Sequence, residues 1–321
     1  MIVDLPSSTT SAVNKKIIEL REHGGVLALG RVLTLVIVTH DGGAIEDSIA
    51  AANAASREHP CRVIVLARGQ RVAAPRLDAQ IRVGGDAGAS EVIVLRGYGN
   101  LAADEAGAGM VVPLLLPDAP VVVWWPGDAP TVPSQHAVGR LAQRRITDAL
   151  SSSNPLEAFE DRRAHHVAGD TDLTWTRLTP WRALLATALD TPPHEPITGV
   201  TVAGEPVSPS TDLLAGWLAT RLPDAEVTRL TAERGPGVVA VRLERPSAPI
   251  SLVRPDGKVG TLRQRGQPDR LVALDRREVR DCLAEELRRM DPDEIYGAAL
   301  ANVGRVVRGG TPVKARELAG T

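Results

Sequence analysis

The stretch Val32-Leu33-Thr34-Leu35-Val36-Ile37-Val38 decides the fold of this chain. It is a continuous run of β-branched and aliphatic residues, which is typical of a strand that is covered on both faces. An Ala-rich segment over 44–57 follows and predicts a helix, and a second apolar run over 61–67 predicts another buried strand. Because a strand, a helix and a strand at this spacing form a crossover unit, we expect a parallel sheet with right-handed connections.

The same alternation extends over the first half of the chain. Helices are expected over 10–23 and 135–150, a short strand at 79–83, and buried strands at 91–95 and 121–125. The segment 110–116 is apolar enough for either a buried helix or a buried strand, and the sequence does not decide between them. Five strands interleaved with helices predict a Rossmann-like, doubly wound α/β domain over residues 1–150.

The second half has a different texture. Residues 151–166 are polar and predict a surface connection, and Thr179-Pro180 predicts the start of a helix that bridges the two halves, so 151–195 is expected to be a linker with a bridging helix. From 196 to 302 the pattern predicts a smaller, mixed α+β domain with an antiparallel meander, including a hairpin at Pro255-Asp256-Gly257. In this domain, helices are expected with an apolar face over 279–290 and over 292–300. Residues 303–321 are expected to be a weakly ordered tail.

The composition excludes several classes of protein. The 321 residues carry 37 Lys and Arg against 39 Asp and Glu, a net charge of −2, so no global field attracts nucleic acid or an anionic membrane. The amino-terminal residues resemble no leader, and no apolar run is long enough to span a bilayer. We therefore expect a cytoplasmic protein of about two domains, with neither a nucleic-acid nor a membrane partner.

The two cysteines, Cys61 and Cys282, support neither a disulfide framework nor a cysteine-based zinc site. Both fall in predicted buried elements, so we expect reduced, buried thiols. The sequence predicts no metal site and no cofactor.

Few residues suggest chemistry. The turn after the first strand, Thr39-His40-Asp41-Gly42-Gly43, is not a dinucleotide-binding fingerprint, and neither a phosphate-binding P-loop nor a nucleophile elbow occurs. His40 lies where an active-site cleft would lie, and the loop Gly84-Gly85-Asp86-Ala87-Gly88 could cradle an anion through its backbone. A turn that needs positive φ explains these glycines equally well, and Asp86 would repel phosphate. His40, Gly84, Gly85, Asp86 and Gly88 form a candidate ligand cleft; the sequence supplies no catalytic set.

The tryptophans and arginines carry more information in a chain with 2% aromatic residues. Trp124 and Trp125 end a predicted strand, so one ring faces the core and the other stands at the sheet edge as a partner anchor, or both are core. Arg144 and Arg145 either bind a phosphate or an acidic partner or form a solvated helix face. A third cluster either fills the domain junction or presents an interface; its candidate partner-binding residues are Trp175, Arg177 and Arg182.

The two possibilities for the tryptophans predict opposite degrees of burial: a core residue is covered, whereas a partner anchor is partly exposed. Trp181 shares a predicted helical face with Leu184, Leu185 and Ala188, so we predict that it is a core residue. For Trp125, next to the Pro126-Gly127 turn, we predict a partly exposed position on a partner surface.

Several of these segments together resemble one family. They include Val123-Trp124-Trp125-Pro126-Gly127 and Arg144-Arg145-Ile146-Thr147-Asp148, and the others lie at 31–38, 84–93, 114–122, 172–182, 252–257 and 281–287. The chain resembles the glucose 6-phosphate dehydrogenase assembly protein (OpcA) family in its actinobacterial form, over essentially its whole length.

The resemblance implies a non-catalytic partner of the oxidative pentose phosphate pathway that binds the dehydrogenase, favours its assembled form and activates it. Redox control through cysteines, associated with cyanobacterial relatives, is not expected here because Cys61 and Cys282 lie in predicted buried elements. Two alternatives remain: a sensor or enzyme that binds a sugar phosphate or nucleotide in the cleft of the first domain, and a scaffold that holds the dehydrogenase without changing its substrate affinity.

Overall fold

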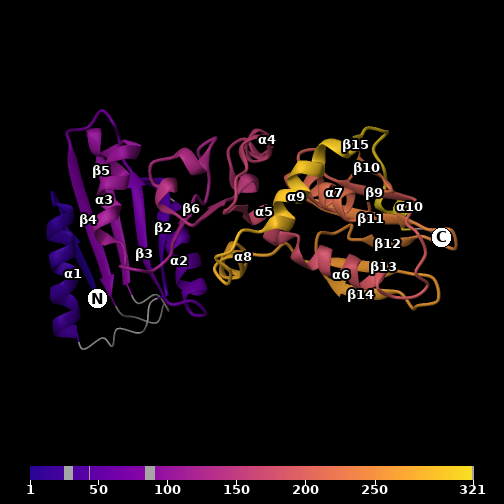
Figure 1. Cartoon of the computed structure of the whole chain (residues 1–321), viewed down its shortest axis with the longest axis horizontal. Coiled ribbons are helices and arrows are strands. Elements are labelled where there is room, and N and C mark those ends of the chain that lie inside the picture. The colour runs from indigo at the N-terminus through magenta and orange to yellow at the C-terminus, as the bar shows by residue number, and fades with distance from the viewer. Residues whose placement is uncertain (25–31, 43, 84–90, 320–321) are drawn as a thin grey trace. The chain divides into compact units, whose positions relative to one another are not determined.

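The computed structural model describes residues 1–24, 32–42, 44–83 and 91–319, and the chain forms two compact units (Figure 1). Unit 1 consists of Met1–Ser153, Gly169–Leu173 and Val279–Pro292. Unit 2 consists of Asn154–Ala168, Thr174–Glu278 and Asp293–Thr321. Each unit is built on one mixed sheet with helices, so the α/β class is confirmed.

Unit 1 contains an eight-stranded sheet with the order β1-β4-β5-β3-β2-β6-β7-β8. The strands from β5 to β8 in this order are parallel, whereas β4 runs antiparallel to β5 and β1 antiparallel to β4. The bounds of the strands are β1 Ile2–Leu5, β2 Leu33–His40, β3 Cys61–Arg68, β4 Arg76–Val83, β5 Glu91–Tyr98, β6 Val121–Trp124, β7 Arg144–Thr147 and β8 Asp170–Asp172. The predicted parallel sheet is therefore correct for its centre, and an antiparallel edge that was not predicted extends it.

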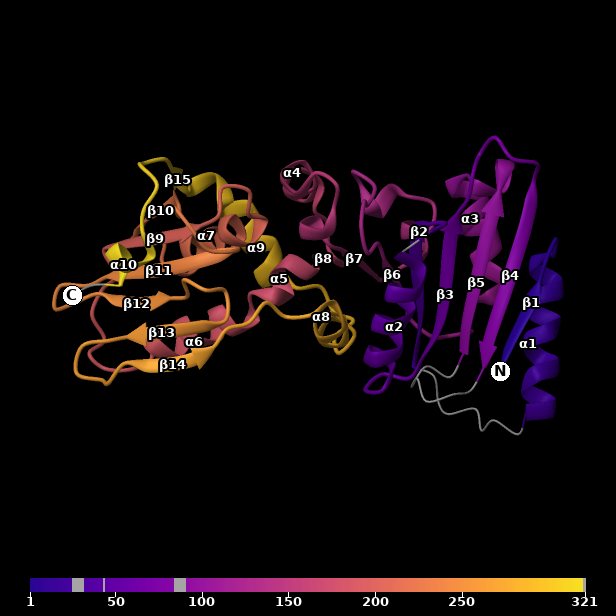
Figure 2. The same cartoon turned by 180° about the vertical axis from the view of Figure 1, so that it is seen from behind.

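Helices cover both faces of this sheet, as expected for a doubly wound domain (Figures 1 and 2). Successive residues of β2 alternate between the faces: Leu35 and Ile37 belong to the core beneath α2 and α8, whereas Val36 and Val38 belong to the core beneath α1 and α3. The bounds of these helices are α1 Thr10–Gly24, α2 Ala44–Ser56, α3 Asp104–Val111 and α8 Val279–Glu286.

The structure decides the segment 110–116, which the sequence left open. Its residues up to Leu114 form the end of α3 and the short 3-10 helix η2 Val112–Leu114, so this part is helical, and Leu114 is fully buried. The remaining 3-10 helices among the described residues are η1 Gly99–Ala102, η3 Pro133–Gln135, η4 Gly139–Leu141, η5 Ala149–Ser151 and η6 Val303–Arg305.

The helix predicted over 135–150 is wrong. That range holds η4, strand β7 and η5 instead. A Cβ atom at Gly139 would lie 1.8 Å from the carbonyl oxygen of Pro133, so the chain folds back tightly here. Strand β7 then carries two arginines whose charges are paired inside the unit, and such a strand has no apolar signature in the sequence.

Helix α8 belongs to unit 1, although the sequence placed residues 279–290 in the second domain. Its Cys282 and Leu283 are fully buried in the same core as Ile45 and Ile49 of α2. The apolar face was predicted correctly, but the face to which it packs was not visible in the sequence.

Unit 2 contains a seven-stranded sheet with the order β14-β13-β12-β11-β9-β10-β15. The strands β11 to β14 form the predicted antiparallel meander, with the Pro255-Asp256-Gly257 turn between β12 and β13. Strands β9 and β10 are parallel and joined through α7, a crossover that was not predicted. The bounds of the strands are β9 Gly199–Gly204, β10 Glu226–Thr231, β11 Val238–Glu244, β12 Ile250–Val253, β13 Val259–Arg263, β14 Arg270–Ala273 and β15 Val307–Arg308. The helices of this unit are α4 Pro155–His165, α5 Leu173–Arg177, α6 Thr179–Leu189, α7 Pro209–Arg221, α9 Glu294–Asn302 and α10 Ala315–Leu318. The first residue of α5, Leu173, is the last residue of a unit 1 segment.

Two segments that were expected to have little structure are ordered elements. Helix α4 occupies the predicted connection and buries Phe159. In the predicted tail, β15 pairs with β10, and α10 buries Leu318 against β11 and β12. Contacts with segments far away along the chain hold both in place, and their own sequences gave no local sign of this.

Candidate functional site

The reversal of strand order in unit 1 lies at β2. The chain continues from β2 through α2 to β3 on one side, and it later adds β6 on the other side of β2. In open parallel sheets, ligands bind outside the carboxyl ends of the strands at such a switch point. A cleft of about 510 Å³ lies at this position, and it is lined by Val38, Thr39, His40, Asp41, Gly42, Pro126, Gly127, Asp128, Ser151, Ser152 and Ser153. His40 is exposed and lines the cleft, as the sequence predicted.

Asp128 organises one wall of the cleft. Its Oδ1 accepts hydrogen bonds from the Ser152 hydroxyl at 2.7 Å and from the backbone N–H and hydroxyl of Ser153 at 2.8 and 2.9 Å. The backbone N–H of Ser153, the two hydroxyls and the nearby His40 lower the pKa of Asp128. The carboxylate is therefore ionised at neutral pH, and it fixes the segment that follows η5.

Asp41 is anchored differently. Its carboxylate accepts a hydrogen bond from the Tyr98 hydroxyl at 2.7 Å and lies 3.3 Å from Nε of Arg96. Both partners come from β5, two strands away from β2. The charge of Asp41 is thus partly balanced, whereas that of Asp128 is held mainly by neutral donors.

The glycine-rich part of the predicted cleft lies outside the described residues: Gly84, Gly85, Asp86 and Gly88. The two residues that flank that loop, Val83 and Glu91, are the last of β4 and the first of β5. Glu91 is in register with Arg62 near the start of β3, so this flank lies at the amino ends of the parallel strands. His40 lies at their carboxyl ends, and the flanks of the loop are therefore at the opposite edge of the sheet.

The tryptophan pair at the end of β6 is entirely internal. Trp124 belongs to the core beneath α2 and Trp125 to the core beneath α1, with 1% and 0% of their surfaces exposed. The Trp125 ring meets the imidazole of His136 edge to face, with centroids 5.6 Å apart. The prediction that Trp125 is partly exposed is wrong, because the chain after Pro126 folds back over its ring.

The basic pair of β7 is also internal. Arg144 pairs with Glu286 of α8, and Nη1 of Arg144 donates to the Asp291 carbonyl at 2.6 Å. Arg145 pairs with Asp170 of β8. Neither a solvated helix face nor an open phosphate site is present at this pair, since both guanidinium groups are buried against internal carboxylates.

The third cluster lies in unit 2. The indole nitrogen of Trp175 donates to Asp293 Oδ2 at 2.7 Å, and the guanidinium of Arg182 lies 3.5 Å from the centroid of the Trp175 ring. Arg177 and Trp175 are buried, whereas Arg182 is partly exposed. Trp181 is 3% exposed, which confirms its prediction as a core residue. Of the seven candidate partner-binding residues, Arg182 alone has a side chain that a partner could reach in this arrangement.

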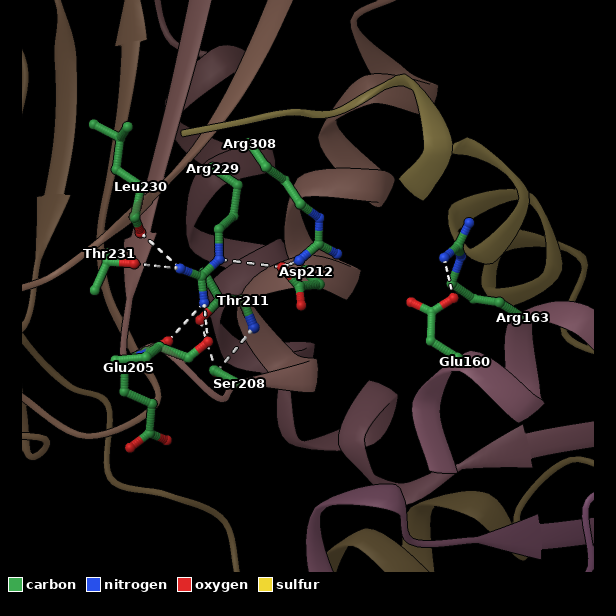
Figure 3. A network of polar contacts seen from close by, with 11 residues as sticks. Glu160, Arg163, Glu205, Ser208, Thr211, Asp212, Arg229, Leu230, Thr231 and Arg308 are labelled. Atoms are coloured by element: carbon green, nitrogen blue, oxygen red, sulfur yellow. Dashed lines mark hydrogen bonds and ion pairs between the residues drawn. The ribbon is translucent and has the colours of Figure 1, made fainter. Parts of the chain in front are cut away.

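A polar network that the sequence did not reveal lies at the amino end of α7 (Figure 3). Arg229 of β10 donates through Nε to Asp212 at 3.1 Å and through Nη2 to the Glu205 carbonyl at 2.6 Å. Arg308 of β15 reaches the same Asp212 oxygen at 3.2 Å. Burial raises the pKa of Asp212, against the lowering effect of both arginines. The network ties β15 and α7 to the sheet, so its role is structural.

Two kinds of feature do not occur in the described part of the chain. Within those residues, no three His, Cys, Asp or Glu side chains are grouped so that they could bind a metal ion. No helix in the same residues is long and apolar enough to cross a membrane.

Comparison with known proteins identifies both halves of the chain. Residues 52–164 match the family model of the N-terminal domain of the glucose-6-phosphate dehydrogenase subunit, and residues 168–300 match the model of its C-terminal domain. A "Putative OxPP cycle protein OpcA" from Synechocystis is 28% identical over 222 residues, covering 63% of this chain and 43% of that protein. The protein of the same name from Synechococcus elongatus is 31% identical over 190 residues, covering 53% and 41%.

The chain thus spans less than half the length of these curated relatives. Among solved structures, a Gfo/Idh/MocA family oxidoreductase from Vibrio cholerae is similar at 11% identity and a TM-score of 0.33, covering 84% of this chain and 94% of that one. A likeness this distant carries no argument about function. Since consecutive family models cover most of both units, the chain belongs to the OpcA family of glucose-6-phosphate dehydrogenase assembly proteins.

Proposed function

We propose that this chain is a non-catalytic assembly factor and allosteric activator of glucose 6-phosphate dehydrogenase in the oxidative pentose phosphate pathway. The observation that carries the proposal is the match of both halves of the chain to domains named for a subunit of that dehydrogenase. The absence of a recognisable catalytic set from the sequence motifs agrees with a binding role.

Activation by a binding partner follows from differential affinity. If the chain binds an active conformation of the dehydrogenase more tightly than an inactive one, the population shifts toward the active state by the ratio of the two affinities. A coupling free energy of about 1 to 3 kcal/mol corresponds to a roughly 5- to 150-fold effect. By reciprocity, ligands that favour the active dehydrogenase must also tighten its complex with this chain.

The buried tryptophans and arginines limit how the chain contacts its partner. Trp124, Trp125 and Trp175 offer no surface to a partner as they are packed here, and Arg144, Arg145 and Arg177 are buried as well. Substitutions at these positions would act on dehydrogenase binding through the stability of the units. The candidate for direct contact is therefore Arg182, which is partly exposed.

Titration of the chain into the cognate dehydrogenase tests the proposal. Initial rates are measured at substrate concentrations below KM, and size-exclusion chromatography with light scattering follows the oligomeric state in the same samples. We expect co-elution and a saturable rise in kcat/KM. A stabilised oligomer with unchanged kinetics would leave only the scaffold function. If the two proteins do not co-elute and the dehydrogenase is not activated, the dehydrogenase is excluded as the partner.

A further inference from the structure

The cleft at the switch point of unit 1 contains groups that the fold does not use. Within the described part of the chain, Oδ2 of Asp128 accepts no hydrogen bond, although Oδ1 accepts three. Neither ring nitrogen of His40 has a hydrogen-bond partner in the same residues. An ionised carboxylate oxygen and an imidazole therefore remain available at the position where open parallel sheets bind ligands.

The size of the cleft fits a small molecule. Its volume of about 510 Å³ lies within the range of roughly 300 to 1,000 Å³ that is common for small-molecule sites. Pro126 and Gly127 form part of the wall, and Val38 adds an apolar surface.

The charges at the cleft disfavour an anionic ligand. The described residues that line the cleft include two carboxylates, Asp41 and Asp128, but no Lys or Arg. Glu46 and Asp47 occupy the first turn of α2, where a phosphate would otherwise use the positive end of the helix dipole. A phosphate in the cleft would approach the carboxylates of Asp41 and Asp128, although Arg96 partly balances the first and His40 the second.

We propose that this cleft binds a small, uncharged molecule with a vicinal diol, the group that sugars and nucleosides share. The Asp128 carboxylate accepts hydrogen bonds from the hydroxyls, as acidic residues do with ribose in dinucleotide-binding folds. The imidazole of His40 donates to or accepts from a further hydroxyl, because its two nitrogens have complementary roles when the ring is neutral. This site is independent of the dehydrogenase-binding function, so either proposal can fail alone.

Saturation-transfer NMR and calorimetry on the full chain test the site with defined probes. The probes are ribose and 2-deoxyribose, both as methyl furanosides so that only the first has a vicinal diol, together with adenosine, 2′-deoxyadenosine and adenosine 5′-monophosphate. We expect ribose or adenosine to bind, the matching deoxy compound to bind about tenfold more weakly or not at all, and the monophosphate to bind more weakly than adenosine. Binding by ribose and adenosine alike identifies a sugar site, and binding by adenosine alone identifies a nucleoside site.

Variants assign the binding to the cleft. Asp128→Asn and His40→Ala are expected to weaken binding about tenfold, whereas Asp118→Asn is expected to leave it unchanged. Asp118 is an exposed aspartate of the same unit with φ of 58°, a conformation that asparagine also tolerates, so the control makes the same chemical change elsewhere. Circular dichroism melts verify that each variant is folded. The proposal is overturned if neither ribose nor adenosine binds, if the deoxy compounds bind equally well, or if Asp128→Asn leaves the binding of ribose and adenosine unchanged.

Discussion

Trp175 and Asp293 are joined by a hydrogen bond of 2.7 Å from the indole nitrogen to Oδ2, although 118 positions separate them in the sequence. The other oxygen of Asp293 caps helix α9 by accepting from the backbone N–H groups of Ile295 and Tyr296, both at 3.0 Å. A single carboxylate thus fixes the start of α9 and orients the ring on which Arg182 stacks.

The first prediction concerns this hydrogen bond. Trp175→Phe keeps an aromatic ring but removes the N–H donor, and we expect a loss of about 1 to 3 kcal/mol of unfolding free energy, because the donor to a charged acceptor disappears. Denaturant unfolding measures the effect. Trp181→Phe is the control, since Trp181 makes no hydrogen bond to the described chain through its indole, and equal losses in the two variants would refute the role of the bond.

Arg182 provides the second prediction. Removing its guanidinium by Arg182→Ala should shift the midpoint of the dehydrogenase titration by about fivefold or more, as interface hot spots do. Arg221→Ala, which truncates an exposed arginine at the end of α7, should leave the midpoint unchanged. Identical midpoints for both variants and the unmodified chain would exclude Arg182 from the contact with the dehydrogenase.

Trp125 is expected to behave as a core residue. Trp125→Ala should destabilise unit 1 by about 3 to 5 kcal/mol, the usual cost of truncating a large buried aromatic side chain. Trp125→Phe should cost much less, because the indole nitrogen of Trp125 is buried without a hydrogen-bond partner among the described residues, so the substitution removes no hydrogen bond. Thermal and denaturant melts compare the two variants; a stable Trp125→Ala protein would contradict the packing described above.

The buried pair Arg144–Glu286 is expected to hold the segment Val279–Pro292 to unit 1. Glu286→Gln leaves a buried guanidinium without its counter-ion, and we expect a loss of about 3 to 5 kcal/mol. Glu58→Gln is the matched control, because it removes the exposed pair between Glu58 and Arg288 of the same segment, and its effect on stability should be far smaller. Similar losses from both substitutions, measured by denaturant unfolding, would show that burial does not decide the contribution.

The thiol of Cys61 gives a pH-dependent prediction. Burial raises its pKa to about 11, while a hydrogen-bond contact with Ser56 at 2.9 Å opposes the shift. Because the folded pKa exceeds the unfolded one, the thiol stabilises the fold fully below about pH 9, and this contribution is lost as the pH rises toward 11. Over that range the unmodified chain should lose roughly 2 to 3 kcal/mol more than Cys61→Ala. Parallel stability curves for the two proteins would contradict the shift.

Local patterns in the sequence determined a large part of the fold. The apolar runs at β2 and β3, the amphipathic helix α1 and the Pro255-Asp256-Gly257 hairpin were all predicted, because each is encoded by residues that are neighbours along the chain. His40 was placed correctly at the carboxyl edge for the same reason, since a strand and its following turn are contiguous.

The tertiary structure alone decided the remainder. Strand β7 was mistaken for a helix because its arginines are paired with Glu286 and Asp170, and Glu286 lies 142 positions away along the chain. Asp128 and Ser153 line the same cleft as His40 only because β6 adds beside β2 at the switch point. Burial of a charge or of an indole depends on such distant partners, and no periodicity in one segment records where another segment will pack.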